Sequence, residues 1–145
     1  MKIKEAEKIT HTLSKPGKMP GYAYSTPAHE CQTGTKLRGV PGSVCFKCYA
    51  YERGRYRFQN VKDAQYKRLE ALKHPQWARA MAIQINSKKV KYFRWHDSGD
   101  VQNLDHLRKI FEVQVNARDP ALDAHARSVD EGLPERVSRK FDYKI

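Results

Sequence analysis

Three short stretches of the chain carry the apolar, aromatic and β-branched residues that are typical of β-strands. They span residues 8–13, 22–26 and 90–96, and turn residues or a proline follow each of them. The second and third stretches are the richest in aromatic side chains. The pattern therefore predicts strands at these three places.

Longer stretches with apolar residues at helical spacing occupy much of the remaining chain. One begins at Asn60, a candidate N-cap, and ends before Pro75, and a second covers residues 76–86. A third follows Asn103, which is also a candidate N-cap. The pattern therefore predicts helices at these three places.

The order of these elements predicts an α/β fold. Strands that alternate with helices form βαβ units, which give a small parallel or mixed sheet. In such sheets ligands bind beyond the carboxyl ends of the strands. Residues 28–48 form a long loop and residues 97–100 a turn, and each segment follows a predicted strand. We therefore expect the two segments at the same edge of the sheet.

The periodic pattern weakens beyond residue 116. We expect a single domain over residues 1–116 and a C-terminal extension over residues 117–145. Within the extension, residues 121–129 predict a short helix, and the last eleven residues predict a helix or a mobile tail.

Charge is distributed unevenly along the 145 residues, whose net charge is +12. Residues 1–100 hold 20 Lys and Arg against 8 Asp and Glu, whereas residues 101–145 hold 8 of each. Such a basic surplus attracts polyanions, nucleic acid first among them, although it also serves solubility. Arg53, Arg55 and Arg57 alternate with aromatic residues and are the candidate nucleic-acid contacts, unless they form a solvated helix face.

The chain shows no sign of a membrane protein or a secreted one. No apolar run approaches the roughly 20 residues that a membrane-spanning helix needs, and the N-terminal segment lacks the apolar stretch of a signal peptide. The three cysteines include a C-x-x-C, which in this setting favours metal or redox chemistry over disulfides. We expect a cytoplasmic protein with no membrane partner.

The cysteines are the strongest candidates for a site. Cys31 stands thirteen residues before Cys45, and the turn from Cys45 to Cys48 can aim both sulfurs the same way. A structural zinc ion takes four ligands and would need a histidine, either the nearby His29 or His96 from the facing segment. An iron–sulfur cluster could instead use the three thiolates and leave one iron open. The alternatives are a redox C-x-x-C and a buried, unreactive Cys31.

The predicted strand at 90–96 adds Arg94, His96 and Asp97 as candidates. Alternation along the strand places Arg94 and His96 on one face of the sheet. Burying an arginine costs several kcal/mol unless it is paired, so we expect Asp97 or Asp100 to pair with Arg94. The arrangement fits either a functional site or a structural ion pair.

Residues 26–31, 45–50 and 93–100 together resemble the phage family called gene product 88. The resemblance extends over about residues 18–113. It implies a phage or prophage origin, with the host cytoplasm as the location, more than it implies an activity.

A second resemblance connects the C-x-x-C, the aromatic residue after it and the acidic turn after the later strand. Together they are similar to the opening of radical S-adenosylmethionine enzymes, in which three cysteines hold a four-iron cluster. This implies a 4Fe-4S cluster with S-adenosylmethionine, contacted by Tyr49 and by the turn Ser98, Gly99 and Asp100. No further strand is predicted after the Asn103 helix, so the resemblance implies a partial barrel around a metal-organised cysteine loop.

Three hypotheses of function follow from these patterns. The first is a phage-type metalloprotein with an iron–sulfur cluster, related to radical S-adenosylmethionine enzymes. The second is a zinc-stabilised basic module that binds nucleic acid. The third is a phage inhibitor of a host nucleoprotein complex. The sequence does not decide whether the protein is an enzyme.

Overall fold

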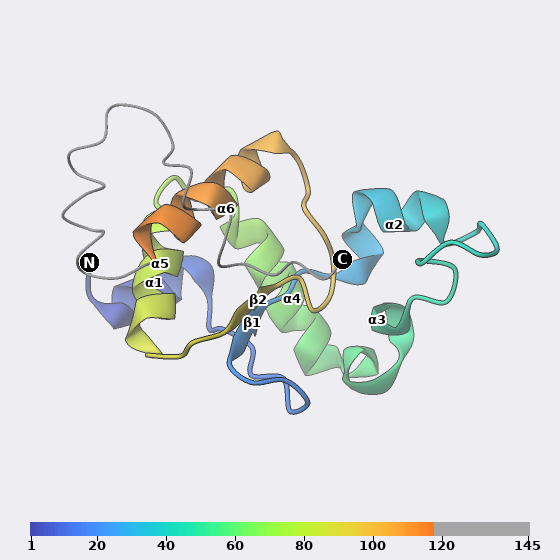
Figure 1. Ribbon diagram of the computed structural model, residues 1–145, viewed down its shortest axis with the longest axis horizontal. Coiled ribbons are helices and arrows are strands. Elements are labelled where there is room, and N and C mark those ends of the chain that lie inside the picture. The colour runs from blue at the N-terminus through green and yellow to red at the C-terminus, as the bar shows by residue number, and fades with distance from the viewer. Residues whose placement is uncertain (118–145) are drawn as a thin grey trace.

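The computed structural model describes residues 1–117, which Figure 1 shows as coloured ribbons. The helices are α1 (Ile3–Thr10), α2 (Gln32–Leu37), α3 (Tyr49–Glu52), α4 (Gln59–Ala71), α5 (Trp77–Ser87) and α6 (Leu104–Asn116). Two short 3-10 helices, η1 (Ala28–Glu30) and η2 (Gly54–Arg57), and two strands, β1 (Tyr22–Tyr24) and β2 (Phe93–Trp95), complete this part of the chain. The mixed α/β class is confirmed, while the elements expected at 121–129 and over the last eleven residues lie outside the described residues.

The two strands form a parallel pair, as the alternation of strands and helices predicted. Tyr22 lies opposite Phe93, and Tyr24 lies opposite Trp95. Hydrogen bonding continues past the strand ends, because the His96 amide donates to the Tyr24 carbonyl at 2.9 Å. The segments that follow β1 and β2 therefore lie side by side at one edge of the sheet.

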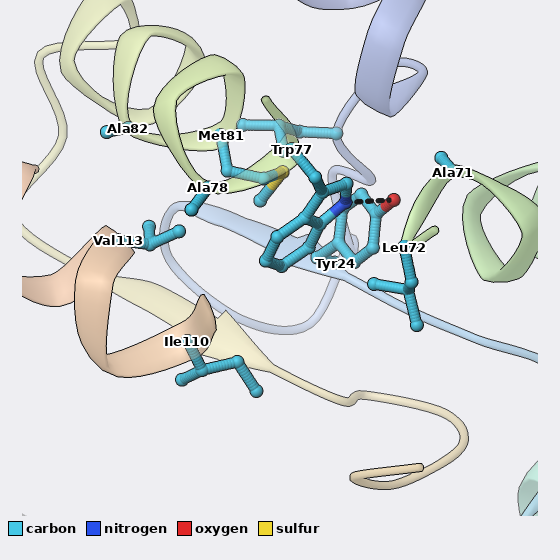
Figure 2. Close-up of a cluster of buried hydrophobic side chains, with 10 residues drawn as sticks. Tyr24, Ala71, Leu72, Trp77, Ala78, Met81, Ala82, Ile110 and Val113 are labelled. Atoms are coloured by element: carbon cyan, nitrogen blue, oxygen red, sulfur yellow. Dashed lines mark hydrogen bonds between the residues drawn. The ribbon is translucent and has the colours of Figure 1, made fainter. Parts of the chain in front are cut away.

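The hydrophobic core lies between the sheet, the C-terminal end of α4 and helices α5 and α6. Trp77, at the start of α5, is fully buried and packs edge-on against Tyr24, with 5.6 Å between the ring centroids. Figure 2 shows the hydrogen bond from the Trp77 indole to the Tyr24 hydroxyl, which is 3.2 Å long. Other buried members are Leu72, directly after α4, Met81 of α5 and Val113 of α6.

Helix α5 is buried around most of its circumference, as expected for a helix that has neighbours on several sides. Three of its buried residues are alanines, whose small side chains allow α1 and α6 to approach closely. Buried polar groups join α5 to the end of α1, because Gln84 donates to the Thr10 hydroxyl and to the His11 carbonyl.

The strand predicted at residues 8–13 is wrong, because residues 3–10 form α1. Ala6 and Thr10 are spaced by one helical turn and are both fully buried. The Glu5 carboxylate accepts a hydrogen bond from the Lys2 amide at 2.8 Å, which stabilises the first turn. The helical face that packs on α5 therefore decides the structure of this segment.

The helices predicted after residues 60, 76 and 103 are confirmed, with small shifts in their ends. Helix α4 begins at Gln59, so Asn60 lies inside it and Phe58 is the N-cap residue. Asn103 does cap α6, since its side chain accepts a hydrogen bond from the His106 amide at 2.8 Å. None of the helices described here is both long and apolar enough to cross a membrane.

We use the name cysteine lobe for residues 28–58, which Figure 1 shows at the end of the molecule opposite α1, α5 and α6. The segment is not the long irregular loop that we expected, because it contains η1 and α2. Polar contacts hold it: Arg38 donates to the Ala28 carbonyl at 2.9 Å, and its guanidinium lies 3.6 Å from the centre of the Tyr51 ring.

The structure does not support a metal-organised loop, because residues 1–117 contain no group of three His, Cys, Asp or Glu side chains placed to hold a metal ion. A partial barrel is not supported either. Residues 1–117 contain a single two-stranded sheet.

Candidate functional site

Two of the three cysteine sulfurs meet at Gly34 in α2. A Cβ atom at this position would lie 2.8 Å from the Cys31 Sγ and 3.6 Å from the Cys45 Sγ. A larger residue at position 34 would therefore force the Cys31 sulfur to shift. Cys48 directly precedes α3, and all three thiols are free.

The thiols also influence one another through their charges. Burial raises the pKa of the Cys31 thiol, a hydrogen bond with the Gly34 backbone lowers it, and Asp100, Cys45 and Cys48 raise it further. Cys45, Cys48 and Asp100, which lies in the turn after β2, are therefore within electrostatic reach of the Cys31 thiol. Within residues 1–117, however, no three His, Cys, Asp or Glu side chains are already gathered closely enough to hold a metal ion.

His29, the nearest candidate for a fourth ligand, lies in η1. Its ring packs on Tyr51, with 4.3 Å between the centroids and 33° between the planes. The described residues do not bring His29 into a metal-binding group with the cysteines.

The turn after β2 forms polar contacts with the C-terminal half of the cysteine lobe. Asp97 is 5% exposed, and its carboxylate forms an ion pair with Arg55 of η2. The Tyr56 hydroxyl lies 2.9 Å from the Asp97 carbonyl, and the Tyr49 hydroxyl lies 3.4 Å from it. Tyr49, the aromatic residue after the C-x-x-C, is therefore brought to this turn.

We expected Arg94 to pair with Asp97, but the structure does not form this pair. It is exposed on β2, whereas Arg55 takes the Asp97 carboxylate. Because the Arg94 side chain is exposed, its charge stays hydrated and needs no buried partner.

The turn from Ser98 to Asp100 packs tightly on the end of β1. Gly99 has a φ of +78°, and a Cβ there would collide with the Thr26 hydroxyl and lie 2.7 Å from the Thr26 carbonyl oxygen. The Thr26 amide donates to the Ser98 carbonyl at 3.1 Å. This close approach leaves Asp100 exposed at the edge of the sheet.

Two histidine rings meet beneath the turn, with 5.3 Å between the centroids of His96 and His106. Burial lowers the pKa of His96, while Asp100 and Asp97 oppose the change. Burial lowers the pKa of His106 to about 4, and the charges of His96 and Lys109 add to the effect. The Gln102 amide donates to His106 Nδ1 at 3.2 Å, so the neutral ring carries its proton on Nε2.

Several buried polar atoms at this edge have no hydrogen-bond partner among the described residues. They are Thr26 Oγ1, His96 Nε2, Asp97 Oδ1, Ser98 Oγ and His106 Nε2. Most buried polar groups in folded proteins are paired, so a cluster of unpaired ones needs a reason. Their place at the carboxyl ends of two parallel strands is where α/β proteins bind ligands.

The comparisons with known proteins agree with the sequence motifs around this edge. A family model described as gene product 88 matches residues 1–120. The chain belongs to the gene product 88 family. Neither a curated protein nor a solved structure is significantly similar to it. The match supports a phage gene product and shows no relation to radical S-adenosylmethionine enzymes.

The arginines that follow the cysteines have different environments in this gene product 88 protein. Arg53 and Arg57 are exposed, and the Arg57 guanidinium lies 5.2 Å from the centre of the Phe58 ring. Phe58 is itself 52% exposed. Arg55 differs from both, because its guanidinium forms an ion pair with the Asp97 carboxylate.

Two residues of the gene product 88 protein contribute to this edge without having been predicted from the sequence. His106 lies at helical spacing from Ile110 and Val113, on the buried face of α6. That spacing was a usable signal for an inward-facing histidine. Tyr56 had no such signal, since it stands between two arginines and its partner Asp97 is 41 residues away.

Proposed function

We propose that this gene product 88 protein binds an iron–sulfur cluster through Cys31, Cys45 and Cys48, next to a cofactor site at the carboxyl ends of β1 and β2. The observation that carries the proposal is the meeting of two cysteine sulfurs at Gly34, within the electrostatic reach of Cys48 and Asp100. Three thiolates without a fourth cysteine suit a cluster with one open iron.

The donor set supports a cluster more than a zinc ion. Thiolates are the ligands of iron–sulfur clusters, and a structural zinc ion would need a fourth ligand as well. His29, the nearest histidine, packs instead on Tyr51. The Cys45 turn is lightly packed, since the neighbouring Val44 is 95% exposed, so gathering the three thiolates around a cluster would disrupt few contacts.

The edge beside the cysteines offers groups that suit an amino-acid cofactor such as S-adenosylmethionine. Asp100 can accept hydrogen bonds from an ammonium group, and the Thr26 and Ser98 hydroxyls can donate to a carboxylate. A bound cluster would supply one-electron chemistry, and the residues of this edge would bind and orient the cofactor.

The direct test is purification without oxygen, followed by absorption spectroscopy and metal analysis. We expect a broad absorption near about 400 nm and about four iron and four sulfide per chain. Replacing any one of the three cysteines by serine should lower the iron content strongly. A colourless protein with one zinc would overturn the proposal.

A matched pair of glycine variants tests the geometry of the thiols. Gly34→Ala adds a methyl group 2.8 Å from the Cys31 sulfur, whereas Gly39→Ala adds one with no atom within 4 Å. We expect Gly34→Ala to lose most of its iron and Gly39→Ala to keep it, with circular dichroism confirming that both fold. Equal iron in both variants would show that the sulfurs at Gly34 do not form the site.

A second function, binding of single-stranded nucleic acid, is favoured by the exposed Phe58 with Arg57 beside it. Stacking of a base on an exposed aromatic ring contributes roughly 1–3 kcal/mol, and nearby arginines contact the phosphates. Arg53 belongs to the same surface, whereas Arg55 contributes less because Asp97 holds it.

Two phenylalanines allow a controlled test of this second function. Phe58 and Phe111 are both 52% exposed, but Phe111 lies on α6, outside the arginine-rich segment. Fluorescence anisotropy with a labelled single-stranded oligonucleotide should show about tenfold weaker binding for Phe58→Ala and little change for Phe111→Ala. Equal binding by both variants would exclude stacking on Phe58.

A further inference from the structure

A groove with a volume of about 370 Å³ lies between the end of α1 and helix α4. Its charged and titratable lining residues are Glu7 and His11 from the α1 segment and Asp63, Lys67 and Arg68 from α4. The size is within the range of sites for small molecules. None of its lining residues belongs to the cysteine site or to the edge of the sheet.

Arg68 is the most unusual group of this groove, because it is a buried charge with neutral partners. The side chain is 6% exposed and donates to the Thr12 carbonyl at 3.0 Å and to the Ser25 hydroxyl at 3.1 Å. Within residues 1–117 no carboxylate forms an ion pair with it, and Asp97 acts on it only from a distance. A buried charge without a counter-ion is costly, so an anion in the groove would stabilise it.

Lys67 adds a second positive charge to the same groove. Its side chain is exposed, and no ion pair of Lys67 is found in the described part of the chain. The two carboxylates of the lining have partners elsewhere. Glu7 lies 3.8 Å from the Lys88 ammonium, and Asp63 accepts a hydrogen bond from Gln59 at 2.7 Å.

His11 is fixed in the groove by a strained backbone. Its φ of 60° and ψ of 170° lie in a region that is essentially restricted to glycine and is found at ligand-binding sites. The Gln84 side chain donates to the His11 carbonyl at 2.8 Å and holds this conformation. Burial lowers the pKa of the imidazole, and the charges of Lys67 and Arg68 lower it further.

We propose that this groove binds a small oxyanion, either a phosphate or a carboxylate group, through Arg68, Lys67 and His11. An anion offsets the two positive charges that disfavour protonation of His11. Binding therefore raises the affinity of the imidazole for a proton, and the protonated ring becomes a third cationic donor. The other charged groups of the lining are the carboxylates of Glu7, which pairs with Lys88, and Asp63.

The first experiment titrates the protein with inorganic phosphate at constant ionic strength while the His11 ring is followed by NMR. We expect saturable shifts of the His11 signals and a higher pKa of the ring with phosphate than with chloride. A parallel titration with acetate distinguishes the two ligand classes, since a carboxylate site responds to acetate and a phosphate site does not. No saturable response to either anion would overturn the proposal.

Two lysine variants separate the groove from general surface charge. Lys67 lines the groove, whereas Lys73 lies just beyond the end of α4, is exposed and pairs with Glu70. Lys67→Ala should weaken phosphate binding about tenfold, and Lys73→Ala should leave it unchanged. Equal weakening by both variants would show that phosphate responds only to the net charge, which would overturn the proposal.

His11→Gly tests the role of the imidazole without a risk to folding. Glycine adopts the positive φ of this position readily, so the variant should be at least as stable as the native protein. We expect its phosphate affinity to fall several-fold at a pH low enough for the His11 ring of the native complex to be protonated. An unchanged affinity in a stable His11→Gly protein would remove His11 from the site.

Discussion

The helical core and the cysteine lobe are held together in different ways. In the core, Tyr24, Trp77 and Met81 are fully buried, and α5 packs against both α1 and α6. The buried apolar cluster of the lobe consists of Ala28, Ala50 and Tyr56. Burial of apolar surface therefore stabilises the core far more than it stabilises the lobe.

The lobe depends instead on polar contacts and on its attachment to the turn after β2. Val44 is 95% exposed and Phe46 is 39% exposed, so this part of the lobe leaves apolar surface in water. Arg55 and Tyr56 connect the lobe to Asp97. Regions with few apolar contacts open most readily, and a ligand that binds only the closed form stabilises them. The comparison shows that the cysteines lie in the part of the molecule where a bound metal would add most stability.

The largest expected effect is that of Trp77→Ala in the core. Loss of this fully buried indole should lower the free energy of unfolding by about 3–5 kcal/mol, measured by chemical denaturation. Phe58→Ala in the lobe removes a half-exposed ring and should change it by less than about 0.5 kcal/mol. If the two variants were equally destabilised, the contrast between core and lobe would be wrong.

The next largest effect is a loss of stability in mild acid, caused by His106. The pKa of this ring is about 4 in the folded protein and 6.5 without the fold, so the unfolded chain binds more protons between these values. Stability from the neutral ring is fully present above pH 6.5 and is lost as the pH falls toward 4. The difference corresponds to about 3 kcal/mol at most.

The check is a series of denaturation curves from pH 7 to pH 4. His106→Gln should reduce the slope of stability against pH, whereas His74→Gln, at an exposed position, should keep it. If His106→Gln kept the same slope of stability against pH as the native protein, other groups would dominate the loss of stability in acid.

Much of the edge that carries the candidate site could be predicted from the sequence. The aromatic stretches around Tyr24 and Trp95 predicted two strands, and the helices between them predicted a parallel pair. Parallel pairing alone brings the segments after the two strands together, because both carboxyl ends lie at one edge. Local pattern and connection rules were sufficient for these features.

Other features could not be predicted, because they depend on contacts between distant residues. Residues 8–13 have a pattern that fits a strand, but the packing of Ala6 and Thr10 on α5 favours a helix over residues 3–10. The sequence offered Arg94 as the partner of Asp97, and only the fold shows that Arg55 takes this place.

A smaller effect is expected at the attachment of the turn to β1. Gly99→Ala combines a φ of +78° with a collision against Thr26, whereas Gly42→Ala has a similar φ of +84° and open space around it. Gly99→Ala should therefore be less stable than Gly42→Ala by roughly 2 kcal/mol in thermal or chemical unfolding. Equal destabilisation would indicate that backbone strain alone matters and that the turn can move away from β1.

The smallest effect is expected from the loss of one tyrosine hydroxyl. The same chemical change can be made in each of the two regions. The Tyr24 hydroxyl lies 2.9 Å from the Thr10 carbonyl and accepts from Trp77, so Tyr24→Phe should lower global stability by about 1–2 kcal/mol. The Tyr56 hydroxyl lies 2.9 Å from the Asp97 carbonyl, and Tyr56→Phe should weaken the attachment of the lobe to this turn by about 1 kcal/mol.

The two variants should differ most in which backbone amides exchange their hydrogens faster. Because the core determines global unfolding, Tyr24→Phe should speed hydrogen exchange at all slowly exchanging amides. Tyr56→Phe weakens only the attachment of the lobe, so it should speed exchange within residues 28–58 and leave α5 and α6 unchanged. Faster exchange throughout the protein in Tyr56→Phe would mean that lobe and core unfold as one unit, and a cluster bound to the cysteines would then stabilise both.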